Sequence, residues 1–231
     1  QRIADYLGRS ASITQFDTLM QDSATHGHIH NLNRSMKAVL LARTLVTTQK
    51  DIIFISPDDK TAEDYCEDLE LLLGQDAAWF LPDYEVLPYE QRSPHYVIRA
   101  QRIQTLSRIF TRKPAVYSLS YRAFLRKMVH PEQFGKNLIH LKKGEEYNPD
   151  VLVSDLVGLG YENQFQVSKV GELARRGGII DVYTPALNHP VRIEFFGDEI
   201  DSIRVFSISS QRSTGEELKE LTIIPSREFS L

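Results

Sequence analysis

Residues 171–206 constrain the fold more than any other part of the chain, because three strand patterns follow one another there with turn residues between them. The first run of β-branched and aromatic residues begins directly after Gly177 and Gly178, and glycine adopts turn conformations that are closed to other residues. The other two runs alternate apolar and polar side chains, as half-buried strands do. The three runs are residues 179–183, 191–195 and 200–206. They predict an antiparallel meander.

The chain before residue 120 shows a different pattern, in which apolar runs alternate with amphipathic segments. The run 52–57 is short, mostly apolar and ended by proline, which is typical of a buried parallel strand. Residues 59–73 place apolar side chains on one helical face and are followed by Gly74, a common helix C-cap. Further strands are expected at 78–81 and 115–119, and further helices at 2–7, 13–20, 39–46 and 98–110. This alternation predicts a doubly wound α/β domain with a parallel sheet.

From residue 137 onward the order of elements changes. A strand at 138–141 is followed by a helix at 149–159, which Asn148 is well suited to cap, and then by the meander. This order predicts a smaller α+β domain. The expected boundaries are 1–127 for the first domain and 128–209 for the second, with 210–231 as a tail that adds a strand at 221–224.

Composition excludes several classes of protein. The single cysteine, Cys66, rules out an internal disulfide framework, and its place on the apolar face of helix 59–73 predicts a small core residue. No apolar run is long enough to span a bilayer and the first residues do not resemble a signal peptide, so we expect a cytoplasmic protein with no membrane contact.

The net charge of −4 hides two neighbouring segments of opposite charge. Residues 58–90 hold eleven acids against Lys60 alone, whereas residues 99–127 hold eight basic residues and no acid. The basic segment could follow a DNA backbone weakly, or it could neutralise the acidic helix 59–73. We favour neutralisation, because the whole chain is acidic and no aromatic side chains are clearly interleaved for base stacking.

Two further groups of residues could carry metal or acid chemistry. The alternating histidines His26, His28 and His30 lack an evident fourth ligand nearby, so we expect no zinc site. The acids of the meander fall at alternating strand positions and at a turn, so we interpret them as solvated or turn-capping groups and expect no catalytic residue. These residues are His26, His28, His30, Asp181, Glu194, Asp198, Glu199 and Asp201.

The strings GELARRGGIID at 171–181 and RIEFFGDEIDSIR at 192–204 carry a family resemblance. They resemble the signature of a repair module shared by the UvrB protein of the bacterial excision nuclease and the bacterial transcription-repair coupling factors. The resemblance covers nearly everything after about residue 31. It implies a P-loop helicase-like parallel sheet domain with the smaller α+β domain inserted into it, and a return of the chain to the first domain at 210–231.

A working phosphate loop reads GxxxxGK[ST], because its glycines let backbone N–H groups approach the phosphates and its hydroxyl holds magnesium. The family alignment places Asn31, Arg34 and Met36 where glycines belong, Lys37 at the lysine and Ala38 at the hydroxyl. Only the lysine is retained. We therefore expect a vestigial loop that binds no nucleotide, a fragment with no cofactor, and no enzymatic activity.

This departure distinguishes the two relatives. UvrB keeps an intact loop and a long aromatic hairpin that probes DNA, whereas LPYEQRSPH at 87–95 runs almost directly into the helix of Arg102 and leaves no room for a hairpin. The chain is thus similar to the N-terminal module of the coupling factors. An ATP-dependent DNA-binding protein of the UvrB class is the alternative.

The resemblance implies a non-catalytic recruitment module in transcription-coupled excision repair, with the UvrA protein of the nuclease as partner of the inserted domain. It implies that Arg176 contacts UvrA, with Arg175 and Tyr183 beside it, and that the surface is masked in the full protein. Relatives often carry arginine where this chain has Glu162, which reverses one charge of the patch. RNA polymerase, DNA and ATP would bind parts of a longer protein, including a C-terminal translocase.

Overall fold

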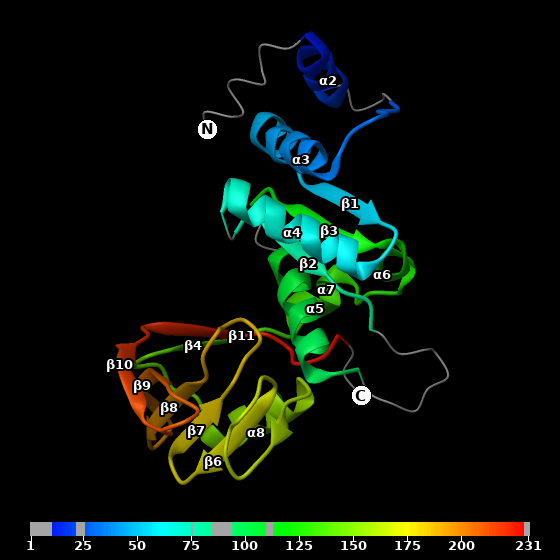
Figure 1. Cartoon of the computed structure of the whole chain (residues 1–231). Helices are drawn as coiled ribbons and strands as arrows, with labels where there is room; N and C mark the ends of the chain where they lie inside the picture. The colour runs from blue at the N-terminus through cyan, green and yellow to red at the C-terminus, as the bar shows by residue number, and fades with distance from the viewer. Residues whose placement is uncertain (1–10, 22–25, 75, 85–93, 110–112, 229–231) are drawn as a thin grey trace. The chain divides into compact units, whose positions relative to one another are not determined.

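The computed structural model describes residues 11–21, 26–74, 76–84, 94–109 and 113–228. The chain forms two compact units (Figure 1). The first unit comprises residues 1–83 and 112–126, and the second comprises 84–111 and 127–231.

The first unit contains a parallel three-stranded sheet in the order β1-β3-β2. Helix α4 packs on this sheet through a buried face of Ala62, Cys66 and Leu69. Its ends are set by local chemistry, because the Asp58 carboxylate accepts a hydrogen bond from the Thr61 amide at 2.7 Å and Gly74 ends the helix at φ 98°. The elements of this unit are α2 (Ala11–Gln21), α3 (Arg34–Thr48), β1 (Ile52–Ser56), α4 (Asp59–Leu73), β2 (Ala78–Leu81), β3 (Val116–Ser120) and α6 (Tyr121–Leu125).

The second unit is built around a six-stranded sheet in the order β10-β9-β8-β7-β6-β5. Strands β6 to β10 are antiparallel neighbours, and β5 joins β6 in parallel. Its elements are α5 (Tyr96–Ile109), α7 (Pro131–Lys136), β4 (Ile139–Lys142), α8 (Pro149–Gly158), β5 (Glu162–Asn163), β6 (Glu172–Arg176), β7 (Ile179–Val182), β8 (Val191–Phe196), β9 (Glu199–Phe206), β10 (Ser213–Glu217) and β11 (Glu220–Ile223).

The turn between β6 and β7 explains the two glycines that the sequence places there. Arg176 and Ile179 are paired, so Gly177 and Gly178 alone connect the strands, and Gly177 has φ 61°. A Cβ atom at Gly178 would lie 3.0 Å from the Phe195 carbonyl oxygen of the next strand. The turn therefore needs glycine for its conformation at one position and for space at the other.

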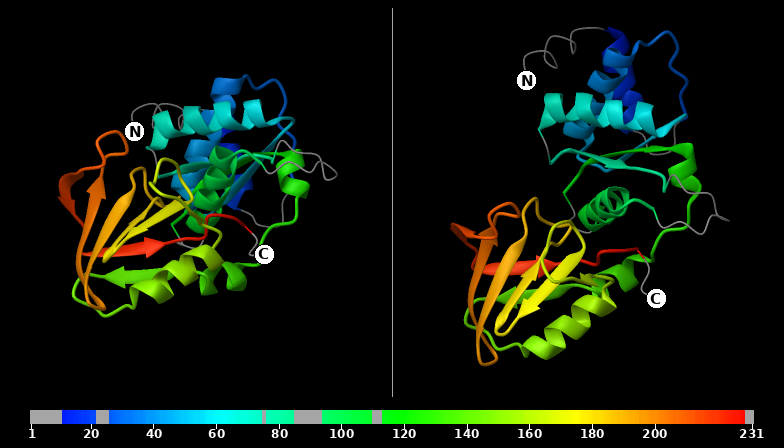
Figure 2. Two further views of the ribbon diagram at one scale, coloured as in Figure 1. Left: turned by 90° about the horizontal axis from the view of Figure 1, so that it is seen from below. Right: turned by 60° about the horizontal axis from the view of Figure 1, so that its bottom comes forward.

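One face of the six-stranded sheet carries the core of the second unit. Leu152 and Leu156 of α8 pack there with sheet residues such as Ile180, and Leu221 of β11 packs in the same cluster. Strand β11 pairs with β4 in a separate antiparallel ribbon, seen as the red and green strands side by side in Figure 2. Because this core covers one face of the sheet, the other face can hold polar side chains.

Most expected elements are confirmed, including the antiparallel meander and the parallel strands of the first unit. Helix α3 begins at Arg34, five residues before its expected start, because the Asn33 side chain caps it by accepting from the Met36 amide at 2.8 Å. Strand β6 was not expected, since its sequence ELARR is half charged. The expected helix at 2–7 lies outside the described residues.

The mixed α/β class is confirmed by the coexistence of parallel and antiparallel sheets. The P-loop helicase-like arrangement and the boundaries at 127 and 209 stay predictions. The compact units group residues 84–111 and 210–231 with the second unit. In particular, the tail strand expected at 221–224 pairs with β4 of that unit.

Candidate partner-binding surface

The face of the six-stranded sheet opposite α8 carries a row of charged side chains. We call it the polar face. Side chains alternate between the two faces of a strand, so Ala174 and Arg176 of β6 lie on the face opposite to Leu173. The cross-strand register then places Asp181 beside Ala174 and Arg192 beside Asp181. The residues of the polar face that matter for the site are Ala174, Arg176, Ile179, Asp181, Tyr183, Arg192, Glu194, Ser202, Arg204 and Phe206.

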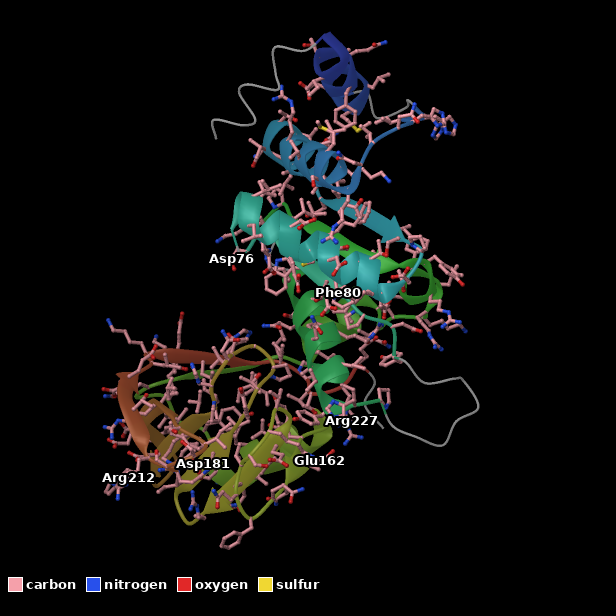
Figure 3. The ribbon with its side chains drawn as sticks, viewed as in Figure 1. Asp76, Phe80, Glu162, Asp181, Arg212 and Arg227 are labelled. Atoms are coloured by element: carbon pink, nitrogen blue, oxygen red, sulfur yellow. The ribbon has the colours of Figure 1, made fainter. Side chains whose placement is uncertain are left out.

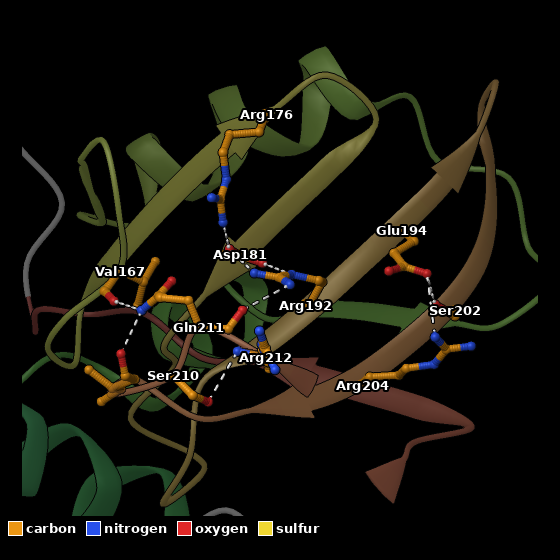
Figure 4. A network of polar contacts seen from close by, with 11 residues as sticks. Val167, Arg176, Asp181, Arg192, Glu194, Ser202, Arg204, Ser210, Gln211 and Arg212 are labelled. Atoms are coloured by element: carbon orange, nitrogen blue, oxygen red, sulfur yellow. Dashed lines mark hydrogen bonds and ion pairs between the residues drawn. The ribbon is translucent and has the colours of Figure 1, made fainter. Parts of the chain in front are cut away.

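Asp181 is the centre of this face. Its Oδ1 accepts a hydrogen bond from Arg192 Nε at 2.7 Å, and its Oδ2 accepts from Arg192 Nη2 at 2.9 Å and from Arg176 Nη2 at 2.7 Å. Figure 4 shows the two guanidinium groups converging on the carboxylate from the neighbouring strands. The Asp181 side chain is 1% exposed, so its charge is stabilised by these bonds in place of water.

The two arginines differ in what remains available to another molecule. Arg192 is 14% exposed, donates a further bond to the Gln211 carbonyl at 3.3 Å, and lies over the Phe206 ring at 5.0 Å. Its bond to Asp181, ahead of the opposing effect of burial, raises its pKa. Arg176 is 46% exposed and donates one described hydrogen bond. The other N–H groups of Arg176 donate no described hydrogen bond.

A small apolar cluster lies among the charged side chains of the polar face. Val167, Ala174 and Phe206 are buried together, and Tyr183 packs against them. The Tyr183 hydroxyl donates to the Asn188 carbonyl at 2.7 Å, and burial raises the pKa of Tyr183. Further along, Glu194 accepts from the Ser202 hydroxyl at 2.7 Å and lies 3.8 Å from Arg204. Tyr183, which the resemblance placed beside Arg176, packs against the cluster that contains Phe206, and Arg192 lies over the ring of Phe206.

Arg175 lies on the other side of the same strand. It pairs with Asp150 in the first turn of α8, and this bond lowers the pKa of Asp150. The structure therefore separates the two arginines that the sequence places side by side, with Arg176 on the polar face and Arg175 toward α8. A flat partner surface cannot cover both faces of one strand, although both residues are near the turn.

Glu162 lies at the start of β5, at the edge of the sheet, and is labelled with Asp181 in Figure 3. Its carboxylate is 3.6 Å from a guanidinium nitrogen of Arg99 in α5. This neighbour balances the charge of Glu162.

Tyr183 also lines an open cavity of about 380 Å³ between α5 and the loop after β7, together with Tyr96, Val97, Val170, Pro185 and Leu187.

The predicted vestigial loop leads into helix α3. Asn31 has φ 60°, Arg34 donates to Asp64 and Asp68 of α4 at 2.8–2.9 Å, and Met36 is partly buried in the first helical turn. Lys37 is exposed, whereas Ala38 is 1% exposed and lies in the core. Residues 26–33 contain no strand before the helix. That this segment binds no nucleotide stays a prediction.

Neutralisation of helix α4 by the basic segment stays a prediction. The described ion pairs of this segment join Arg99 to Glu162, Arg102 to Glu228 and Arg126 to Asp83, all outside α4. The acids of α4 pair instead with Arg34 and Lys60, and Lys60 lies 2.9 Å from Asp64.

The interpretation of Asp181 as a solvated acid was wrong, because its side chain is buried between the two arginines. Asp198 accepts from the Asn148 side chain at 3.2 Å, and Glu199 and Asp201 are exposed, as expected for turn and solvated groups. Within the described ranges no three potential metal ligands lie together, and the rings of His28 and His30 stack at 6.3 Å. None of the helices described is both long and apolar enough to cross a membrane.

Arg192 was also missed by sequence reasoning. The available signal was the pairing of an acid and a base at facing positions of adjacent strands, Asp181 opposite Arg192. That signal depends on the register of β7 against β8, which a one-residue slip would reverse.

Comparison with known proteins finds similarity in both units of the chain. Residues 139–229 match the family described as UvrB interaction domain, which contains the entire polar face. Transcription-repair-coupling factors are similar over most of the chain. The protein of Haemophilus influenzae is 30% identical over 88% of this chain, that of Myxococcus xanthus 34% over 87%, and that of Mycobacterium bovis 32% over 99%.

The chain spans only 17–19% of the length of these relatives. Within that span the similarity is spread over both units. The chain is therefore similar to one part of the transcription-repair-coupling factors, and its residues 139–229 match the UvrB interaction domain.

Proposed function

We propose that the second unit is a non-catalytic recruitment module that binds UvrA through the polar face of its sheet. The observation that carries the proposal is the state of Arg176, which is held at one nitrogen by a buried carboxylate while 46% of its side chain stays exposed. A fixed, partly exposed guanidinium is suited to bind a partner carboxylate in a bidentate manner. Arginine is also among the residues most enriched at interface hot spots.

The family description supports an interaction role for residues 139–229. The names of the similar proteins join repair to transcription. We propose on this basis that the chain belongs to a longer cytoplasmic factor in which it brings excision repair to RNA polymerase stalled at DNA damage. RNA polymerase, DNA and ATP would bind other parts of that factor.

The alternative, an ATP-dependent DNA-binding protein of the UvrB class, has less support. The Asn33 side chain already accepts a hydrogen bond from the Met36 amide in the first turn of α3, and Ala38 offers no hydroxyl for magnesium. We propose that this unit has no cofactor. Weak DNA binding by residues 99–127 has little support, because Arg102 is fully buried and Arg126 is paired with Asp83.

The test is a calorimetric titration of the 231-residue chain with purified UvrA, beside Arg176→Ala. We expect the variant to lose roughly 2 kcal/mol, about thirtyfold in Kd, as a hot-spot arginine does. Arg122→Ala is a matched control, because Arg122 is an exposed arginine of α6 in the other unit. Absence of binding by the folded wild type would refute the proposal, and equal losses in both variants would refute the assignment of the face.

A further inference from the structure

The buried carboxylate of Asp181 holds two arginines but needs only one of them. Arg192 reaches both carboxylate oxygens, Oδ1 with Nε and Oδ2 with Nη2. That bidentate pair, supported by the Phe206 ring and the Gln211 carbonyl, already compensates the buried charge. The bond from Arg176 to Oδ2 is therefore additional to what the fold requires.

The additional bond has an effect on Arg176 itself. A free arginine side chain samples many rotamers, and fixing it on binding would cost rotamer entropy. The 2.7 Å bond from Nη2 to Asp181 fixes the guanidinium in the unbound protein. It also leaves the Nε edge and the other terminal nitrogen without a described acceptor, in a side chain that is 46% exposed.

We infer that Asp181 is a positioning residue that presents Arg176, already oriented, to a carboxylate on the partner's surface. The inference rests on the proposed binding of UvrA. A carboxylate fits better than a nucleic-acid phosphate, because Asp181 and Glu194 lie on the same face and a phosphate backbone brings many charges along a strand. Alternation along β6 and the register of β10 add Glu172 and Glu217 to this face, so an extended polyanion would be repelled.

The experiment measures the Kd for UvrA of four forms of the full chain: wild type, Arg176→Ala, Asp181→Asn and the double variant. Asparagine keeps the shape of Asp181 but loses the charge and turns a donor toward a guanidinium. We expect Asp181→Asn to weaken binding about tenfold. In the double variant we expect a loss within about twofold of that of Arg176→Ala alone, because residues that act through each other are not additive. An unchanged Kd in Asp181→Asn, or losses that multiply, would overturn the inference.

The failures are distinguishable. If the wild type does not bind UvrA, the proposed function fails; if it binds and Arg176→Ala weakens it while Asp181→Asn does not, only the positioning role fails. Asp155→Asn is the matched control, because Asp155 belongs to α8, which packs on the opposite face, and accepts a 2.6 Å bond from the Tyr147 hydroxyl. A DNA duplex is titrated as well. Retention of DNA that Arg176→Ala abolishes would overturn the choice of a carboxylate partner.

A measurement on the wild type covers the case in which Asp181→Asn does not fold. Nuclear magnetic resonance of the guanidinium groups compares Arg176 with Arg204, whose nearest described carboxylate oxygen is 3.8 Å away. We expect restricted rotation about the Nε–Cζ bond of Arg176 and free rotation in Arg204. Equally free rotation in both residues would show that Asp181 does not hold Arg176.

Discussion

A buried ion pair joins helix α5 to the end of the described chain, and its removal should be the most damaging single change in the second unit. Arg102 and Glu228 have side chains that are 0% and 2% exposed. Arg102 donates from Nε to one carboxylate oxygen and from Nη2 to the other at 3.4 Å. The Tyr84 ring lies 4.2 Å from the centre of the guanidinium, and burial, then the charge of Glu228, raises the pKa of Tyr84.

The size of the effect follows from the burial of both partners. Replacing Glu228 by leucine removes the carboxylate that pairs with the buried Arg102 charge, which costs about 3–5 kcal/mol. Neighbouring bonds, such as Ser226 N–H to the Leu159 carbonyl at 3.0 Å and Arg227 Nε to the Gly160 carbonyl at 3.1 Å, do not replace the lost charge. Because a domain of this kind is stable by only about 5–15 kcal/mol, the loss should be large enough to measure easily.

The assay is urea denaturation followed by circular dichroism, with amide exchange of α5 and β11 to localise the effect. The double variant Arg102→Met with Glu228→Leu tests the reasoning, because two apolar side chains of similar volume remove both charges. We expect its free energy of unfolding to lie within about 1 kcal/mol of the wild type. A single variant that costs less than about 1 kcal/mol, or a double variant as unstable as the single, would refute the account.

Two further predictions concern groups with shifted pKa values. Burial, then the nearby Glu70 charge, raises the pKa of Cys66 to about 12. A thiol reagent should therefore label Cys66 only after unfolding. Labelling of the native chain at the rate of free cysteine would contradict the burial of Cys66. Burial, then the hydrogen bond to Asp155, raises the pKa of Tyr147 to about 12 from an unfolded value near 10. Between about pH 10 and 12 the folded state therefore binds more protons than the unfolded state, and stability should fall as pH rises through that window. Tyr147→Phe should lose part of this decline in urea midpoints, and an unchanged slope would refute the assignment.

Much of the fold was predictable from local patterns. Helix α4 and strand β2 occupy the expected residues. The amphipathic pattern between Asp58 and Gly74 predicts a helix buried on one face, and the short apolar run predicts a buried strand. The turn at Gly177 was predictable because two adjacent glycines favour a turn, and Gly177 does adopt a positive φ that most residues avoid. Strand β6 was not, since its charged half is stabilised by partners from other segments, Asp150 for Arg175 and Asp181 for Arg176.

The sequence by itself determined the antiparallel meander, the parallel strands and the family resemblance, including the presence of Arg176 at the turn. These features depend on residue type and spacing along the chain. Only the tertiary structure decided that Arg175 and Arg176 lie on opposite faces of the sheet and that Asp181 is a buried partner of Arg176 and Arg192. The reason is physical: a charge is stabilised by whatever lies within a few ångströms of it, and strand register determines those neighbours.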